Sequence, residues 1–219
     1  MITASWIPLV PSVLIENGEV EQFLVEDHDV AVWRSSQGHV QIWQNRCPHR
    51  SVRLSLGHVQ GESLVCAYHG WQFAAEDGHC QRIPAQPEQR APKTLCATAY
   101  AVKETDGMIW YGGQVAPQQT WIMNTQAQVY AGSVTVSATL PQVQDYLMEL
   151  GLSELGEQSS GLVWRGYASD AGLRIYLTPT QSSVVTVHAM LVQHERASTR
   201  HALLNQMRQY LEQEQLSHV

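Results

Sequence analysis

Short apolar or β-branched runs alternate with polar turn segments over about the first 115 residues. The breaks contain residues that favour turns, for example Glu16-Asn17-Gly18 and Ser35-Ser36-Gln37-Gly38. Runs of this length, separated in this way, are typical of a sandwich or barrel of short strands. The pattern therefore predicts an all-β N-terminal domain, with strands near residues 7–10, 21–25, 30–34, 40–44, 63–66, 70–74, 100–103 and 108–111.

Two segments interrupt this strand pattern. Residues 83–92 contain three prolines, which cannot donate to a central ladder, so this stretch is predicted to be a loop or an edge. Residues 112–119 contain a Gly-Gly pair and Pro117, which mark a boundary. We therefore predict two domains, at residues 1–116 and 121–219.

The second half of the chain has a mixed pattern. Thr139 is a good N-cap for a helix that begins near Pro141 and ends at Gly151. From about Ser198, apolar residues recur at i, i+1, i+4, i+7 and i+8, which predicts an amphipathic closing helix. The order β-α-β-β-β-α predicts a small antiparallel sheet with helices on one face, an α+β domain. Its strands are predicted at residues 129–139, 162–167, 173–177 and 184–192.

Composition and charge exclude several classes of protein. The 219 residues are 44% hydrophobic and 15% charged, as in ordinary globular chains. The net charge of −7 argues against a nucleic-acid partner, which would require clustered Lys and Arg. No apolar run is long enough for a membrane helix, and the first residues do not resemble a secretory signal. We therefore expect a cytoplasmic protein that binds neither nucleic acid nor membrane.

Two short motifs combine cysteine and histidine. Cys47-Pro48-His49 is followed, after sixteen residues, by Cys66-Ala67-Tyr68-His69. Two Cys and two His could hold one zinc ion, but a Cys-x-His pair converges on one metal only in a tight loop. The pairs suit a Rieske [2Fe–2S] cluster better, because each loop then gives its Cys to one iron and its His to the other. The candidate metal and cofactor ligands are thus Cys47, His49, Cys66 and His69. The other cysteines, Cys80 and Cys96, are predicted to be buried small apolar side chains.

The segments Cys47–Arg50 and Cys66–Trp71 resemble the cluster loops of Rieske non-haem iron oxygenases, the ring-hydroxylating and demethylating family. This resemblance covers about residues 5–115 and implies an all-β Rieske domain with a [2Fe–2S] cofactor. Ser51 departs from the family, which usually has Gly at this position. Further matching segments are Trp6 with Pro8, Arg53-Leu54-Ser55 and Gly107-Met108-Ile109-Trp110.

Residues near the motifs indicate a cluster of low potential. Rieske proteins of respiratory complexes have an additional Cys in each loop, joined by a disulfide, where this chain has Val52 and Tyr68. They also offer Ser and Tyr hydroxyls to the cluster, where this chain has Trp71 and Phe73. Fewer hydrogen bonds destabilise the reduced cluster, so we predict a potential of about −150 mV, which suits an NAD(P)H-linked reductase.

Three arginines, Arg46, Arg50 and Arg53, flank the first motif in an otherwise acidic chain. One hypothesis is that they form a docking patch for an acidic reductase or ferredoxin. The alternative is that they are solvated or pair with nearby acids.

The second half lacks the usual iron site of an oxygenase, an acid followed by two histidines on a helix. His188 and His194 have a suitable interval, but no acid precedes them at helical spacing. They are therefore interpreted as surface histidines, and His201 and His218 add no motif. Residues 177–191 resemble the end of an oxygenase catalytic domain, so this half is either a reduced helix-grip domain or an unrelated α+β module.

Three functions remain compatible with the sequence. The first is an electron-transfer component of a Rieske oxygenase system, with a reductase or ferredoxin as donor and an oxygenase subunit as acceptor. This role is compatible with a homo- or hetero-oligomer. The second is a minimal oxygenase whose own mononuclear iron site is unrecognised. The third is a non-enzymatic redox sensor. The iron content separates the first two, since they differ by one iron per chain.

Overall fold

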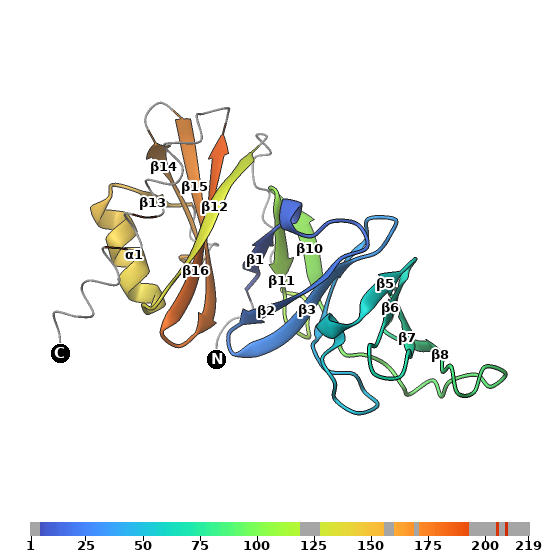
Figure 1. Cartoon of the computed structure of the whole chain (residues 1–219). Coiled ribbons are helices and arrows are strands. Elements are labelled where there is room, and N and C mark those ends of the chain that lie inside the picture. The colour runs from blue at the N-terminus through green and yellow to red at the C-terminus, as the bar shows by residue number, and fades with distance from the viewer. Residues whose placement is uncertain are drawn as a thin grey trace.

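The computed structural model describes residues 5–118, 128–155, 160–168 and 171–192, together with the single positions 205 and 209. Strands dominate residues 5–118, and two short 3-10 turns lie between them (Figure 1). The turns are η1 Ser12–Leu14 and η2 Leu54–Leu56. The strands are β1 Ile7–Pro11, β2 Val20–Val25, β3 His28–Arg34, β4 Val40–Gln44, β5 His58–Gln60, β6 Ser63–Val65, β7 Gln72–Ala74, β8 Cys80–Arg82, β9 Ala99–Tyr100, β10 Val102–Thr105 and β11 Met108–Tyr111.

These strands form three antiparallel sheets, with the orders β1-β11-β10, β2-β3-β4-β9 and β5-β6-β7-β8. Every strand expected from the pattern in this part of the chain is present, and the prediction of an all-β N-terminal part is confirmed. β5 and β8 were not predicted, because three-residue strands are too short to show a period of two. The proline-rich residues 83–92 contain no strand, as predicted.

The C-terminal part is a five-stranded antiparallel sheet of order β12-β16-β15-β14-β13 with a helix, α1. Thr139 caps α1 as predicted, in a capping box with Gln142. The final helix expected from Ser198 lies outside the described residues, apart from helical Asn205 and Gln209. No helix in the described ranges is long and apolar enough to cross a membrane. The elements are β12 Val129–Val136, α1 Leu140–Glu149, β13 Ser153–Glu154, β14 Val163–Ala168, β15 Ala171–Gln181 and β16 Val184–Val192.

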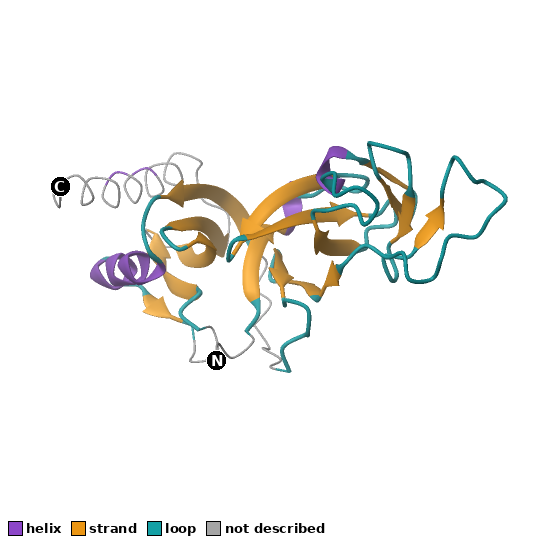
Figure 2. Ribbon diagram, turned by 90° about the horizontal axis from the view of Figure 1, so that it is seen from below, coloured by secondary structure: helices purple, strands orange, loops and turns teal. Residues whose placement is uncertain are grey.

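The α+β description of the chain is confirmed, and the two faces of the C-terminal sheet have different neighbours. α1 covers the face that points away from the N-terminal part (Figures 1 and 2). Side chains on the opposite face, among them Tyr176 and Met190, share a buried cluster with Trp6 and Trp110 of the N-terminal part. Figure 2 shows both parts from below, with α1 on the outer side.

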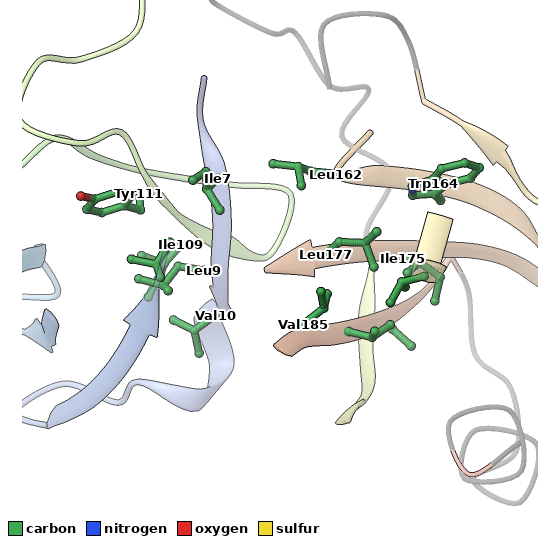
Figure 3. Packing of buried hydrophobic residues seen from close by; sticks show 14 of the residues in the cluster. Ile7, Leu9, Val10, Ile109, Tyr111, Leu162, Trp164, Ile175, Leu177 and Val185 are labelled. Carbon is green, nitrogen blue, oxygen red and sulfur yellow. The ribbon is translucent and has the colours of Figure 1, made fainter. Parts of the chain in front are cut away.

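A second, larger hydrophobic cluster also joins the two parts. β1 contributes Ile7, Leu9 and Val10, and the C-terminal sheet contributes Leu177 and Val185 among others (Figure 3). The turn between β2 and β3 adds backbone hydrogen bonds from residues 26 and 27 to carbonyls of β15, of 2.8 and 2.9 Å. The two parts are therefore packed against each other through a buried, hydrogen-bonded contact.

Candidate metal centre

The two predicted ligand loops have the same backbone design. In each, the Cys N–H donates to the carbonyl five residues on, and the N–H four residues on donates back to the Cys carbonyl. The residue four positions after each Cys is left-handed, with φ of +56° at Ser51 and +67° at Gly70. The bonds are Cys47 N to Val52 O (2.8 Å), Ser51 N to Cys47 O (2.8 Å), Cys66 N to Trp71 O (2.9 Å) and Gly70 N to Cys66 O (3.0 Å).

The loops bring all four predicted ligands to one end of the N-terminal part. Cys47 and Cys66 are buried, 3% and 2% exposed, whereas His49 is half-buried and His69 exposed. The two imidazole rings are neighbours, with centroids 4.7 Å apart. Thiols therefore line the inner side of the site, and imidazoles line its outer side.

Aromatic side chains of the second loop hold both imidazoles. The Trp71 indole stacks on His49 of the first loop, with centroids 4.0 Å apart and planes at 7°. Tyr68 packs against its neighbour His69 at 3.9 Å, and its own side chain is largely exposed. Trp71 thus fixes an imidazole across the gap between the loops.

The local electrostatics favour uncharged side chains before any metal binds. Burial raises the pKa of the Cys47 thiol to about 11, and the neighbouring Cys66 thiol adds to this rise. The backbone N–H groups of His49 and Arg50 act in the opposite direction by hydrogen bonding to the sulfur. Partial desolvation lowers the pKa of His49, and its electrostatic interactions with the neighbouring His69 and Arg50 side chains lower it further.

The side chains at this site fit a Rieske cluster. Two inner sulfur donors and two outer nitrogen donors match the division into a thiolate-bound iron and an imidazole-bound iron. The N–H groups directed at the Cys47 sulfur would stabilise its thiolate form once a metal has displaced the proton. Within the described residues, no group of three or more His, Cys, Asp or Glu side chains is arranged so that it could hold a single metal ion.

The two remaining cysteines differ from each other. Cys80 is fully buried, as predicted, and burial raises the pKa of its thiol. Cys96 is only partly buried, so the prediction that it is a buried side chain was wrong. Its sulfur lies 3.9 Å from His79 Nδ1. His79 and Cys96 are direct antiparallel partners, so the side chains of Cys80 and Cys96 point to opposite faces.

The interpretation of His188 as a surface residue was wrong. Its side chain is buried in the contact between the two parts, and both ring nitrogens have hydroxyl partners. Nδ1 lies 2.6 Å from Ser133 Oγ, and Nε2 lies 3.1 Å from Thr178 Oγ1. The other histidines considered for a metal role, His194, His201 and His218, lie outside the described residues.

The three arginines near the first loop have different surroundings. Arg53 Nε lies 3.2 Å from the Asp29 carboxylate, which favours the alternative of local pairing for this residue. Arg46 and Arg50 are exposed, and neither forms an ion pair in the described part of the chain.

The backbone of Ser51 leads to a stability prediction. A left-handed φ costs an L-residue about 1–2 kcal/mol, partly offset by the greater unfolded-state freedom of Gly. Ser51→Gly should therefore raise the free energy of unfolding by about 0.5–1 kcal/mol, measured by urea denaturation. Ser36→Gly, in an exposed turn without positive φ, is the control and should give no gain. An equal gain from both variants would contradict the prediction.

Comparison with known families assigns this site to a class. Residues 5–104 match the family model described as Rieske [2Fe-2S] domain. Residues 5–104 are therefore a Rieske domain, a family that binds a [2Fe–2S] cluster, and the four predicted ligands lie within these residues.

Its similarities extend to Rieske oxygenase components. The chain is 34% identical over 105 residues to oxidoreductase NdmD of Pseudomonas putida, covering 48% of this chain and 18% of NdmD. It is 36% identical over 107 residues to the oxygenase subunit of 3-chlorobenzoate-3,4-dioxygenase from Comamonas testosteroni, covering 48% and 24%. The chain thus spans less than a quarter of the length of these relatives.

The fold likeness covers more of the chain than these sequence matches. The crystal structure of apo dicamba monooxygenase aligns with a TM-score of 0.73 over 98% of this chain and 84% of that one, at 18% identity. The C-terminal sheet therefore belongs to the shared fold.

Proposed function

We propose that the protein is a Rieske-type electron-transfer component of a non-haem iron oxygenase system. It would accept electrons from a reductase or ferredoxin and pass them to an oxygenase iron on another subunit. When bound, the [2Fe–2S] cluster supplies one-electron chemistry. Cys47 and Cys66 would hold its inner iron, and His49 and His69 its outer iron.

The observation that carries this proposal is the exposure of the imidazole side of the site. His69 is exposed, and the aromatic ring of Tyr68 beside it is 61% exposed. Both loops lie at the end of the molecule remote from the C-terminal sheet (Figure 1). A redox group with its outer ligands at that end is accessible to a separate protein, whereas the chain's own C-terminal half lies on the other side.

The test is purification under anaerobic conditions, followed by iron and sulfide analysis and EPR of the reduced protein. We expect two irons and two sulfides per chain, an average g below that of the free electron, and a potential of about −150 mV. A reductase should reduce the protein, and adding it to a separate oxygenase should stimulate substrate oxidation. A colourless protein with one zinc would contradict the proposal, as would a potential above zero.

A second candidate is a minimal oxygenase with its own mononuclear iron. The fold likeness to apo dicamba monooxygenase across the C-terminal part favours it. Three irons per chain, and substrate oxidation without a separate oxygenase subunit, would support this candidate over the first.

Charge reversal at Arg50 tests whether this exposed side chain helps to dock an acidic electron donor. Arg50 is exposed beside His49 and would attract an acidic donor, so Arg50→Glu should slow reduction about tenfold at low salt. High salt should remove most of the difference, because it screens exposed charges. Stopped-flow reduction by a reductase or ferredoxin measures this effect.

The control is Arg165→Glu, which reverses an exposed charge on β14 of the C-terminal part. It should leave the rate of reduction unchanged. Equal rates for the Arg50 variant and the unsubstituted protein at low salt would remove the docking hypothesis.

A further inference from the structure

The two ends of the first cluster loop lie side by side. Asn45 precedes the loop and Ser55 follows it, and two hydrogen bonds join them. Ser55 N–H donates to Asn45 Oδ1 at 2.8 Å, and Asn45 Nδ2 donates to Ser55 Oγ at 2.9 Å. Asn45 is fully buried, so these bonds are shielded from water.

Asp29, at the start of β3, anchors this pair to the sheet. Its Oδ1 accepts a hydrogen bond from Asn45 Nδ2 at 2.8 Å, and its Oδ2 accepts one from Arg53 Nε at 3.2 Å. The Asn45 backbone N–H also donates to the Asp29 carbonyl at 3.0 Å. We call Asn45, Ser55, Asp29 and Arg53 the loop clasp.

Backbone pairing of two strands closes the base of the second loop. It connects β6 directly to β7, and these strands pair up to Val65 and Gln72 at the base of the loop. The first loop instead joins β4 to the η2 turn, and no strand ladder closes its base. Side-chain hydrogen bonds therefore close the base of the first loop, whereas backbone pairing of β6 with β7 closes the base of the second.

From this we infer that the clasp positions the loop that carries Cys47 and His49, and so controls how firmly the cluster is held. Asn45 and Asp29 are positioning residues, since neither is a predicted ligand. The inference rests on the proposed function, because it requires a cluster bound at these loops. It also assigns Arg53 to bracing the loop, which separates it from exposed Arg50.

The experiment compares the release of cluster iron to a chelator, followed by bleaching of the visible absorbance of the full-length, cluster-loaded protein. Asn45→Ala should release iron about tenfold faster, as is usual when a group that orients a metal ligand is removed. Gln22→Ala is the matched control, because Gln22 also donates to Asp29 Oδ1 (2.9 Å) but lies outside the clasp. It should release iron at the rate of the unsubstituted protein.

Two further variants keep the test decisive if Asn45→Ala folds poorly. Ser55→Ala loses the Oγ acceptor but keeps the backbone bond, so it should accelerate release by a smaller factor. Asn45→Asp places two carboxylates together and should accelerate release. Combining it with Asp29→Asn restores one donor and one acceptor at the contact, and should return both the release rate and the EPR g values toward those of the unsubstituted protein.

An unchanged rate of iron release in the Asn45→Ala and Ser55→Ala variants would overturn the role of the clasp but not the proposed function. The same holds if the double variant with Asn45→Asp and Asp29→Asn releases iron no more slowly than Asn45→Asp alone. Absence of a cluster from the unsubstituted protein would overturn the proposed function and the clasp together.

Discussion

Replacing either Cys47 or Cys66 with alanine should bring the bound iron and sulfide of the purified protein to background. Both thiols are buried on the inner side of the site, where no other described cysteine is available to substitute for them. The inner iron would then retain a single protein thiolate, and the cluster would not be held. Iron and sulfide analysis after reconstitution measures the loss, and the visible spectrum reports it independently.

The same chain provides matched controls for this prediction. Cys80→Ala removes a buried thiol from the same hydrophobic cluster, and Cys96→Ala removes a partly exposed one. Both variants should keep two irons per chain. Full iron content in the Cys47 variant, or its loss in the Cys80 variant, would show that the predicted ligands are wrong.

Local patterns explain why so much of this fold was predictable from sequence. The Thr139 cap, the apolar run at residues 184–192 and the turn segments between β1 and β4 depend on residues close together in the chain. The Cys and His motifs are local as well, since each loop is closed by hydrogen bonds within six consecutive residues. Short-range chemistry of this kind is visible in a single sequence.

The features that were missed depend on contacts between distant segments. The loop clasp pairs Asn45 with Asp29, sixteen positions earlier, and nothing in the spacing of these residues indicates it. The burial of His188 depends on Thr178, whose hydroxyl donates to the Pro8 carbonyl, 170 positions away. The sequence predicted the strand at residues 184–192, but not that another part of the chain covers His188 on it.

The burial of His188 should make the stability of the protein depend on pH between about 6.5 and 4. Thr178 Oγ1 donates to Pro8 O at 2.6 Å, so it accepts from His188 Nε2–H, and His188 Nδ1 then accepts from the Ser133 hydroxyl. Both partners are uncharged hydroxyls, so no carboxylate at these contacts offsets the cost of burying a charged ring, and the neutral imidazole is favoured. Complete desolvation accordingly lowers the pKa of His188 from 6.5 to about 4.

The sign and size of the effect follow from proton linkage. Below pH 6.5 the unfolded chain binds a proton at His188 that the folded protein does not, so stability falls as the pH drops toward 4. Over that range the loss from this one residue is about 3 kcal/mol, and above pH 6.5 it contributes no pH dependence. Urea denaturation at a series of pH values from 7 to 4 measures the change.

The variant that isolates this contribution is His188→Gln, which can still accept and donate a hydrogen bond but does not titrate. It should be less stable than the unsubstituted protein at pH 7, because its amide cannot meet both hydroxyls as the ring does. Between pH 7 and 4, the free energy of unfolding of this variant should fall less than that of the unsubstituted protein. The difference between the two falls should be about 3 kcal/mol, since carboxylates elsewhere titrate equally in both proteins. Parallel pH profiles would mean that the folded protein accommodates a charged His188 in spite of its burial, and would contradict the prediction. The neutral imidazole is therefore the form in which His188 links the C-terminal sheet to β1, and that link involves both nitrogens that a metal would need.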